Sequence, residues 1–268
     1  AGTREGGMYV SFDSAEHWIP LLANRGDVRG IAVDPKNSQI IYASLNQQIY
    51  KTIDGAKTWK QLFSESRGEA ILDLQIDPDN SNILYAGIND GQVIKSVDSG
   101  VSWKLVANLE SQVREILISQ ADPKIIYVAT LQKGIFKTYN AGSDWQSLRK
   151  SLDEFDGALN FGDLALSKNS TDTLILASKY GLLKTANGGL SWQAIKLLTP
   201  VNSVVIYSLA VNPGNPNEIV YGTNQTLFKS RDGGKTWISK PLPNTRTPRI
   251  IVVDPANNQT LYLGALTL

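Results

Sequence analysis

The sequence contains no cysteine, one histidine and one methionine among its 268 residues. The lack of cysteine excludes disulfides, thiol nucleophiles and cysteine-ligated metals together. A single histidine, His17, argues against a histidine-based zinc site and against a serine-histidine triad. We therefore expect no metal and no cofactor.

Net charge and long apolar stretches are missing as well. The 26 basic and 25 acidic residues leave a net charge of +1, so no bulk field favours nucleic acid or a membrane surface. No apolar run approaches the roughly 20 residues that a membrane-spanning helix needs. With 42% hydrophobic residues, residues 1–268 are expected to form one monomeric all-β domain that binds no nucleic acid.

All six tryptophans end copies of one eight-residue phrase. The intervals between successive tryptophans are 41, 44, 42, 47 and 45 residues, a period typical of propeller blades. The copies are SFDSAEHW (11–18), TIDGAKTW (52–59), SVDSGVSW (96–103), TYNAGSDW (138–145), TANGGLSW (185–192) and SRDGGKTW (230–237).

The phrase predicts a turn that its own side chains hold. Its central Asp or Asn can accept backbone hydrogen bonds, its glycine allows positive φ, and its tryptophan buries a large ring. Two copies carry the amides Asn140 and Asn187 in place of the carboxylate. Because an amide cannot perform carboxylate chemistry, we predict a structural role for the phrase.

Each interval also carries four strand patterns in the same order. The first ends at an Asp-Pro or an equivalent turn, where proline stops the ladder. The second is rich in β-branched and aromatic residues, and a short polar turn leads to the third. In one interval the four patterns are 72–76, 83–88, 92–96 and 102–106.

The phrase Ser/Thr-x-Asp-x-Gly-x-Thr-Trp resembles the Asp-box, or bacterial neuraminidase repeat, over essentially the whole chain. The Asp-Pro, Asn and Tyr-x-Gly phrasing between copies is most similar to xyloglucanase-type glycoside hydrolases, photosystem II assembly factors and sortilin-like receptors. The resemblance implies a β-propeller that is secreted, periplasmic or on the cell surface. It does not select a function, because enzymes and binding scaffolds share it.

The chain begins with third and fourth strand patterns (7–22) and ends with first and second ones (249–266). Together these halves would make one blade. We therefore predict a six-bladed propeller of four-stranded antiparallel blades, closed by pairing of the terminal strands, which would protect the sheet edges.

Aligned first strands give two apolar rows that we predict as core. The rows are Ile31, Leu74, Ile116, Leu164, Leu209 and Ile251, then Val33, Ile76, Ile118, Leu166, Val211 and Val253. Just before them, the column at Arg29, Arg114, Tyr207 and Arg249 and the column at Asp73, Glu115 and Asp163 are expected to meet at a central opening.

These columns support two readings. Arginines can clamp an anionic partner or a sugar carboxylate, and Tyr180, Tyr207 and Phe155 could add aromatic contacts at the same opening. The long connection 146–162 has the length of a binding loop. Our first reading is therefore a non-catalytic scaffold that binds a protein or a glycan.

The alternative is a glycoside hydrolase, xyloglucanase-like or sialidase-like. Paired carboxylates such as Asp73 and Asp163, with Glu115 nearby, could supply its acid and base. However, every tryptophan already belongs to a repeated phrase, which leaves few aromatic platforms for a polysaccharide. The sequence leaves open whether the protein is an enzyme.

Overall fold

The computed structural model describes all residues except 4–5, 12, 14–15, 23–25, 243–245, 255–256, 258 and 267–268. These residues form two compact units. Unit 1 comprises Ala1–Ile118, Pro123–Thr130 and Thr138–Trp145. Unit 2 comprises Ser119–Asp122, Leu131–Lys137 and Gln146–Leu268.

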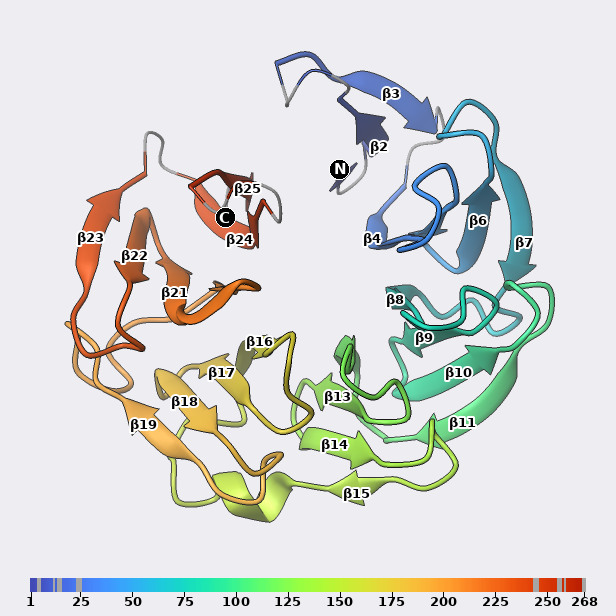
Figure 1. Ribbon diagram of the computed structural model, residues 1–268. Coiled ribbons are helices and arrows are strands. Elements are labelled where there is room, and N and C mark those ends of the chain that lie inside the picture. The colour runs from blue at the N-terminus through green and yellow to red at the C-terminus, as the bar shows by residue number, and fades with distance from the viewer. Residues whose placement is uncertain are drawn as a thin grey trace. The chain divides into compact units, whose positions relative to one another are not determined.

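Unit 1 is built from antiparallel sheets whose strands follow the chain order (Figure 1). Its first sheet has three strands, two complete four-stranded sheets follow, and the pair β12–β13 begins the third repeat. The strands are β1 (Gly2–Thr3), β2 (Gly7–Val10), β3 (Ile19–Leu22), β4 (Val28–Val33), β5 (Ile41–Leu45), β6 (Gln48–Thr52), β7 (Lys60–Ser64), β8 (Ile71–Ile76), β9 (Leu84–Ile88), β10 (Gln92–Ser96), β11 (Lys104–Asn108), β12 (Val113–Ile118) and β13 (Ile126–Thr130).

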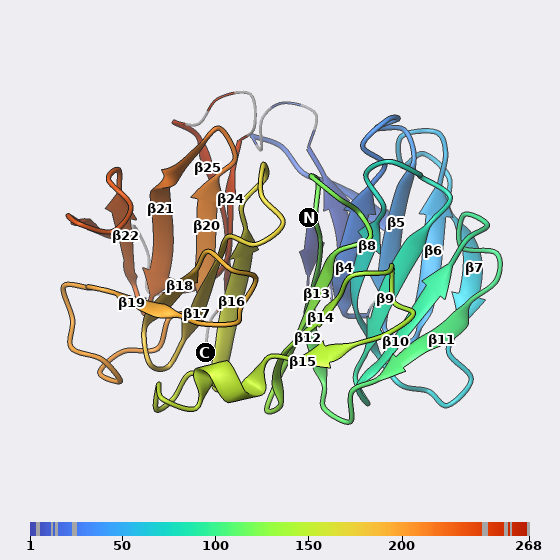
Figure 2. The same cartoon turned by 60° about the horizontal axis from the view of Figure 1, so that its bottom comes forward.

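Unit 2 continues the pattern with the pair β14–β15, two four-stranded sheets and the two-stranded sheet β24–β25. In Figure 2, β24 lies beside β20. The elements are β14 (Gly134–Thr138), β15 (Gln146–Ser147), the 3-10 helix η1 (Arg149–Leu152), β16 (Phe161–Leu166), β17 (Leu174–Ser178), β18 (Leu182–Thr185), β19 (Gln193–Ile195), β20 (Ser208–Asn212), β21 (Asn215–Thr223), β22 (Thr226–Ser230), β23 (Ile238–Pro241), β24 (Thr247–Val253) and β25 (Leu261–Leu266).

The structure confirms an all-β fold with four strands in each complete repeat. The first strand ends where the sequence predicts, because the Asp77 carboxylate Oδ1 accepts the backbone N–H groups of Asp79 and Asn80, at 2.8 and 3.0 Å. This closes a turn directly after β8, as expected of an Asp-Pro pair. Among the described residues, no helix is long and apolar enough to cross a membrane.

The terminal strands form two separate sheets, β1-β2-β3 and β24-β25. The predicted composite blade needs one edge of β2 for the second strand of the blade. In unit 1 that edge is occupied by β1, where Gly2 pairs with Met8 and Thr3 pairs with Gly7. Six blades and closure by terminal pairing are therefore not confirmed, and both stay predictions.

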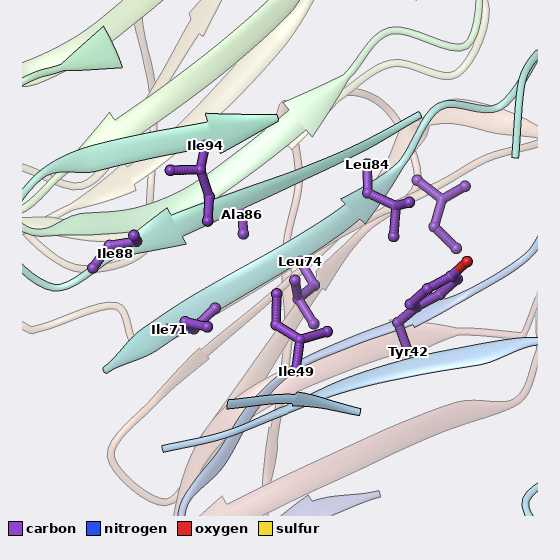
Figure 3. Close-up of a cluster of buried hydrophobic side chains, with 9 residues drawn as sticks. Tyr42, Ile49, Ile71, Leu74, Leu84, Ala86, Ile88 and Ile94 are labelled. Atoms are coloured by element: carbon purple, nitrogen blue, oxygen red, sulfur yellow. The ribbon is translucent and has the colours of Figure 1, made fainter. Parts of the chain in front are cut away.

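The core of unit 1 lies between successive sheets (Figure 3). Tyr42 and Ile49 from the β4–β7 sheet pack against Leu74, Leu84 and other apolar residues of the β8–β11 sheet. Leu74 and Leu84 are completely buried, so each sheet contributes one apolar face to the boundary with the next.

The predicted core row is wrong at two positions. Ile31 and Val33 on β4 are 36% and 50% exposed, whereas Leu74 at the equivalent place on β8 is buried. Leu74 is covered by Tyr42 and Ile49 of the four-stranded sheet before it, whereas the sheet before β4, β1-β2-β3, has only three strands. The row therefore predicts which side of the sheet a side chain faces, but it does not predict whether another side chain covers it there.

The tyrosine of β21 lies one residue later along its strand than the tyrosine of the second strand β9. Leu74 faces Ala86 in the β8–β9 pair, whereas the equivalent Leu209 faces Tyr221 in the β20–β21 pair. Tyr221 therefore points to the opposite side of its sheet from Tyr85, since successive residues of a strand alternate. It stacks on Phe228, with ring centroids 4.7 Å apart.

The repeated phrase forms the turn that its sequence predicts. In the second copy, the Thr52 hydroxyl donates to Asp54 Oδ1 at 2.7 Å and accepts the backbone N–H of Ala56 at 3.0 Å. Hydrogen bonds from the Thr58 hydroxyl and amide lower the pKa of Asp54 to about 2. The amide copy at Asn140 keeps the same turn, because its Oδ1 accepts the Asp144 N–H at 2.9 Å.

The phrase also joins neighbouring sheets in unit 1. The Tyr42 hydroxyl donates to the carbonyl of Ser99 at 3.2 Å. The Tyr85 hydroxyl donates to the carbonyl of Ala141 at 3.0 Å. Each tyrosine sits on a second strand and each carbonyl belongs to the phrase of the following repeat, so the phrase fixes the position of one sheet against the next.

Candidate binding surface

Phe155 and Tyr180 lie together in unit 2. Phe155 belongs to the loop between η1 and β16, and Tyr180 lies in the tight turn between β17 and β18. Their rings meet edge to face, with centroids 5.2 Å apart. The sequence predicted both residues for the binding site, and the structure brings this pair into contact.

A third loop joins the pair. The backbone N–H of Asn202 donates to the carbonyl of Tyr180 at 3.3 Å. Gly157 adopts a φ of +89°, which L side chains rarely adopt, and it lies against the Asn202 side chain where the loops meet. We call residues 153–160, 179–181 and 198–205 the three-loop surface.

The three-loop surface exposes aliphatic side chains that the sequence analysis missed. Leu198, Val201 and Val205 are 59%, 56% and 47% exposed. They lie in the connection between β19 and β20, which has no hydrophobic periodicity to predict its conformation. Its length and its cluster of apolar residues beside Pro200 were the available indications.

Tyr207 and Arg249 form a second contact in unit 2. The Arg249 guanidinium carbon lies 4.5 Å from the centroid of the Tyr207 ring. Tyr207 directly precedes β20, two residues after the three-loop surface, and its backbone N–H donates to the Gly222 carbonyl at 2.9 Å. Arg249 is the extra residue of a β-bulge between Pro248 and Ile250, a feature that often redirects a side chain near a functional site.

Bulges also explain the arginine column in unit 1. Arg114 occupies the bulge between Val113 and Glu115, and its Nη1 donates to Gln112 Oε1 at 3.2 Å. Arg29 lies in the irregular register after Val28 and forms an ion pair with Asp27 at 2.8 Å. These two arginines belong to unit 1 and Arg249 to unit 2, so their predicted convergence stays a prediction.

Unit 1 carries a polar network on the loops before β8 and after β9. Arg67 pairs with Glu65 at 2.7 Å and with Asp90 at 2.5 Å. Burial alone would raise the pKa of Glu65, but hydrogen bonds from the Arg67 guanidinium and from the Glu69 and Arg67 amides lower it below its usual value. Asn89 continues the network by donating to Glu69 at 2.9 Å. The charged groups of this network therefore pair with one another.

Asp73, the first predicted catalytic carboxylate, holds two strands together. Its Oδ2 accepts the backbone N–H of Ile116 on β12 at 2.7 Å, and its Oδ1 accepts the N–H of Leu74 at 2.8 Å. The side chain keeps some exposed surface, but its carboxyl group lies deep, and burial raises the pKa of Asp73 to about 7. That value would suit a general acid, although both oxygens already serve the backbone.

Asp163 repeats this arrangement in unit 2. Its Oδ1 accepts the N–H of Leu164 at 2.9 Å, and its Oδ2 accepts the N–H of Leu209 on β20 at 2.6 Å. Glu115 takes the same position on β12, directly after the bulge residue. Catalytic roles for these three carboxylates stay predictions. The hydrogen bonds of Asp73 and Asp163 give these two residues a structural role, because each links one first strand to the next.

Within the described part of the chain, no group of three or more His, Cys, Asp or Glu residues could hold a metal ion.

Comparison with known proteins places the chain by its fold. No protein-family model matches the sequence, and no curated protein sequence matches it. Among solved structures, the GH74 enzyme of Niastella koreensis matches 97% of this chain with a TM-score of 0.79 and 21% identity. The GH74 xyloglucanase of Xanthomonas campestris matches 98% with a TM-score of 0.76 and 18% identity. YCF48 bound to a D1 peptide matches 90% of this chain and 90% of its own, with a TM-score of 0.50 and 15% identity.

The likeness is one of fold. Both kinds of neighbour are propellers, so the chain has a propeller-type architecture. It spans about half of the two GH74 chains, 48% of each. At these identities, fold does not carry activity from one protein to another.

Proposed function

We propose that this chain is a non-catalytic propeller module that binds a protein partner through the three-loop surface. The observation that carries the proposal is the aromatic pair Phe155–Tyr180, joined by a backbone hydrogen bond to a loop whose Leu198, Val201 and Val205 are exposed. Large exposed apolar residues grouped on one face mark interaction sites. Aromatic anchors among such residues carry most of the binding energy of protein interfaces.

Exposed apolar side chains occur in both units, but those of unit 1 such as Ile53, Val97 and Val101 lie in copies of the repeated phrase, for which we predict a structural role. The loops before β8 and after β9 carry charges that pair internally, such as Arg67 with Glu65 and Asp90. The three-loop surface instead presents apolar groups whose burial would be favourable. Loops held on a rigid sheet scaffold are common positions for binding residues.

A protein partner fits this surface better than a glycan. Sugar rings stack on flat aromatic faces that are open to solvent. Here Phe155 and Tyr180 pack edge to face, and the Arg249 guanidinium covers one face of Tyr207. The aliphatic residues Leu198 and Val201 suit the apolar centre of a protein interface. The YCF48 neighbour, which is bound to a peptide, offers a precedent for this use of the fold.

Peptide selection provides the test. A displayed library of random peptides is selected on the folded protein, and the affinity of enriched peptides is measured for Phe155→Ala and Tyr180→Ala. We expect each substitution to weaken binding about tenfold or more, the scale of an interface hot spot. Tyr139→Ala, on an exposed tyrosine in unit 1, is the control. Unchanged affinity in both surface variants would refute the proposal.

A glycoside hydrolase is the second candidate, favoured by the TM-score of 0.79 to a GH74 enzyme and by the raised pKa of Asp73. Asp73 would act as the general acid, with Asp163 or Glu115 as its partner. Incubation with xyloglucan and sialylated oligosaccharides should then release product. In that case Asp73→Asn should abolish turnover while leaving substrate affinity nearly intact, because the amide cannot exchange a proton.

The proposal extends to architecture and place of action. We infer six blades closed by the terminal strands, a monomeric state, and an exported or surface location, as the resemblance to Asp-box propellers implies. Closure requires β1 to leave the edge of β2, to which it is paired through two residues.

A further inference from the structure

Arg249 differs from the other arginines of its column in what surrounds its charge. Arg29 has a carboxylate partner in Asp27, and Arg114 donates to Gln112. In the portion of the chain that the structure describes, the Arg249 guanidinium makes no hydrogen bond and no ion pair, and its Nε is buried without an acceptor. The guanidinium instead lies over the ring of Tyr207.

The backbone around this stack is fixed on both sides. The Ser208 hydroxyl donates to the Pro248 carbonyl at 3.0 Å, which ties β20 to the residue before Arg249. The Tyr207 amide is held by the carbonyl of Gly222, and the Thr247 hydroxyl bonds Asn224 Oδ1 at 3.2 Å. The bulge and these bonds hold the arginine and the ring in place, so little order remains to be created when a ligand arrives.

The contact with the Tyr207 ring is not a hydrogen bond, so it leaves the N–H bonds of the guanidinium available to an acceptor. The five N–H bonds lie in the plane of the group and point outward along its edges. A planar carboxylate matches two of these bonds at once. A buried N–H without an acceptor is unfavourable, so a small shift of Arg249 that brings an oxyanion to the Nε edge would relieve that cost.

We propose that Arg249 and Tyr207 form a carboxylate-binding subsite beside the three-loop surface. This deepens the proposed function and rests on it, because the carboxylate would belong to the bound polypeptide. The polypeptide would place apolar side chains on Phe155 and Tyr180 and an acidic group on Arg249. The acidic group is an Asp or Glu side chain or a C-terminal carboxylate.

The direct test follows the arginine Nε–H signals by NMR. The Nε–H signal of Arg249 is assigned as the signal that disappears in Arg249→Gln. This signal is then followed during titration with acetate and, separately, with the neutral isostere acetamide. We expect acetate to shift this signal saturably and acetamide to leave it unchanged. Arg231→Gln, on an exposed arginine of the same unit, is the control and should keep the acetate response. No acetate response, or an equal response to acetamide, would overturn the subsite.

Peptide variants separate the two sources of the carboxylate. Each selected peptide is made with a free or an amidated C-terminus and with its acidic residues kept or changed to amides. We expect one of these changes to weaken binding at least tenfold, and the same loss to appear in Arg249→Gln with the unmodified peptide. Tyr207→Leu should give an intermediate loss, because the charge remains but its orientation does not.

The outcomes distinguish this subsite from the proposed function. If peptides bind through Phe155 and Tyr180 while neither carboxylate removal nor Arg249→Gln matters, the subsite is wrong and the proposed function stands. If acetate binds at Arg249 while Phe155→Ala leaves peptide affinity unchanged, the three-loop surface is wrong and the anion site stands. Melting temperatures of all variants must match the wild type, which shows that a loss of binding is not a loss of fold.

Discussion

Replacing Asp73 by Asn tests whether this carboxylate is a structural link between β8 and β12. The wild-type carboxylate accepts N–H groups from both Ile116 and Leu74. Both oxygens of a carboxyl group keep acceptor capacity when it is protonated, whereas asparagine has one acceptor oxygen, so one buried N–H loses its partner. That loss costs about 1–3 kcal/mol. The variant should therefore be less stable than the wild type under acidic conditions, where Asp73 is protonated in the folded protein.

The difference should change sign or shrink as the pH rises. Burial raises the folded pKa of Asp73 from 3.8 to about 7, so between these values the unfolded chain has released a proton that the folded protein retains. The free energy of unfolding of the wild type therefore falls as the pH rises through this window and is level above it. At about 1.4 kcal/mol for each unit, the full effect reaches about 4 kcal/mol. Asparagine does not titrate, so the variant lacks this loss.

Urea unfolding at about pH 4 and about pH 8 measures both effects, since pH-dependent stability reports the difference in bound protons. The wild type should be the more stable protein at the lower pH, and its advantage should be smaller or reversed at the higher one. Asp79→Asn, which alters an exposed carboxylate in the turn after β8, controls for general charge effects. A stability difference for Asp73→Asn that is the same at both pH values would refute this account of the carboxylate.

Two further substitutions and one deletion test other parts of the fold. Tyr85→Phe removes the hydrogen bond to the Ala141 carbonyl and should lower unfolding free energy by about 0.5–1.5 kcal/mol, measured in urea; an unchanged value would show that the bond contributes nothing. Gly162→Ala would place a Cβ 2.2 Å from the Ile206 carbonyl oxygen and should cost about 1–3 kcal/mol, so a fully stable variant would contradict the packing. Deletion of 249–268 should cause aggregation if the terminal strands close the propeller, whereas a monomer with an unchanged melting temperature would exclude closure.

The regular part of the fold could be predicted because the same strand and turn patterns recur in each repeat. Apolar alternation and the Asp-Pro turn place β8 within a residue of its observed position, and the tryptophan phrase specifies its own turn through side chains two and four residues apart. The positions of Arg114 and Arg249 in one column were also readable. The sequence did not show that the residues of this column lie in β-bulges, because a bulge depends on how the first strand pairs with the second.

The remainder depends on contacts between segments that share no pattern. Tyr221 looks equivalent to Tyr85 in sequence, yet a one-residue difference in register turns it to the other face of its sheet. Phe155 meets Tyr180 only because two irregular loops pack together. The short strand β1 pairs through two residues, too few for a periodic pattern. Asp73 and Asp163 have the composition of a catalytic pair, and only their hydrogen bonds show that they bind the backbone of neighbouring strands.

Hydrogen exchange with a selected peptide bound tests the central claim most directly. Amides that become ordered or covered on binding exchange more slowly, so the protected segments map the contact surface. The proposed function predicts protection in residues 153–160, 179–181 and 198–205 and none in the loop carrying Glu65 and Arg67. Protection confined to the loops of unit 1, with the three-loop surface unchanged, would contradict it.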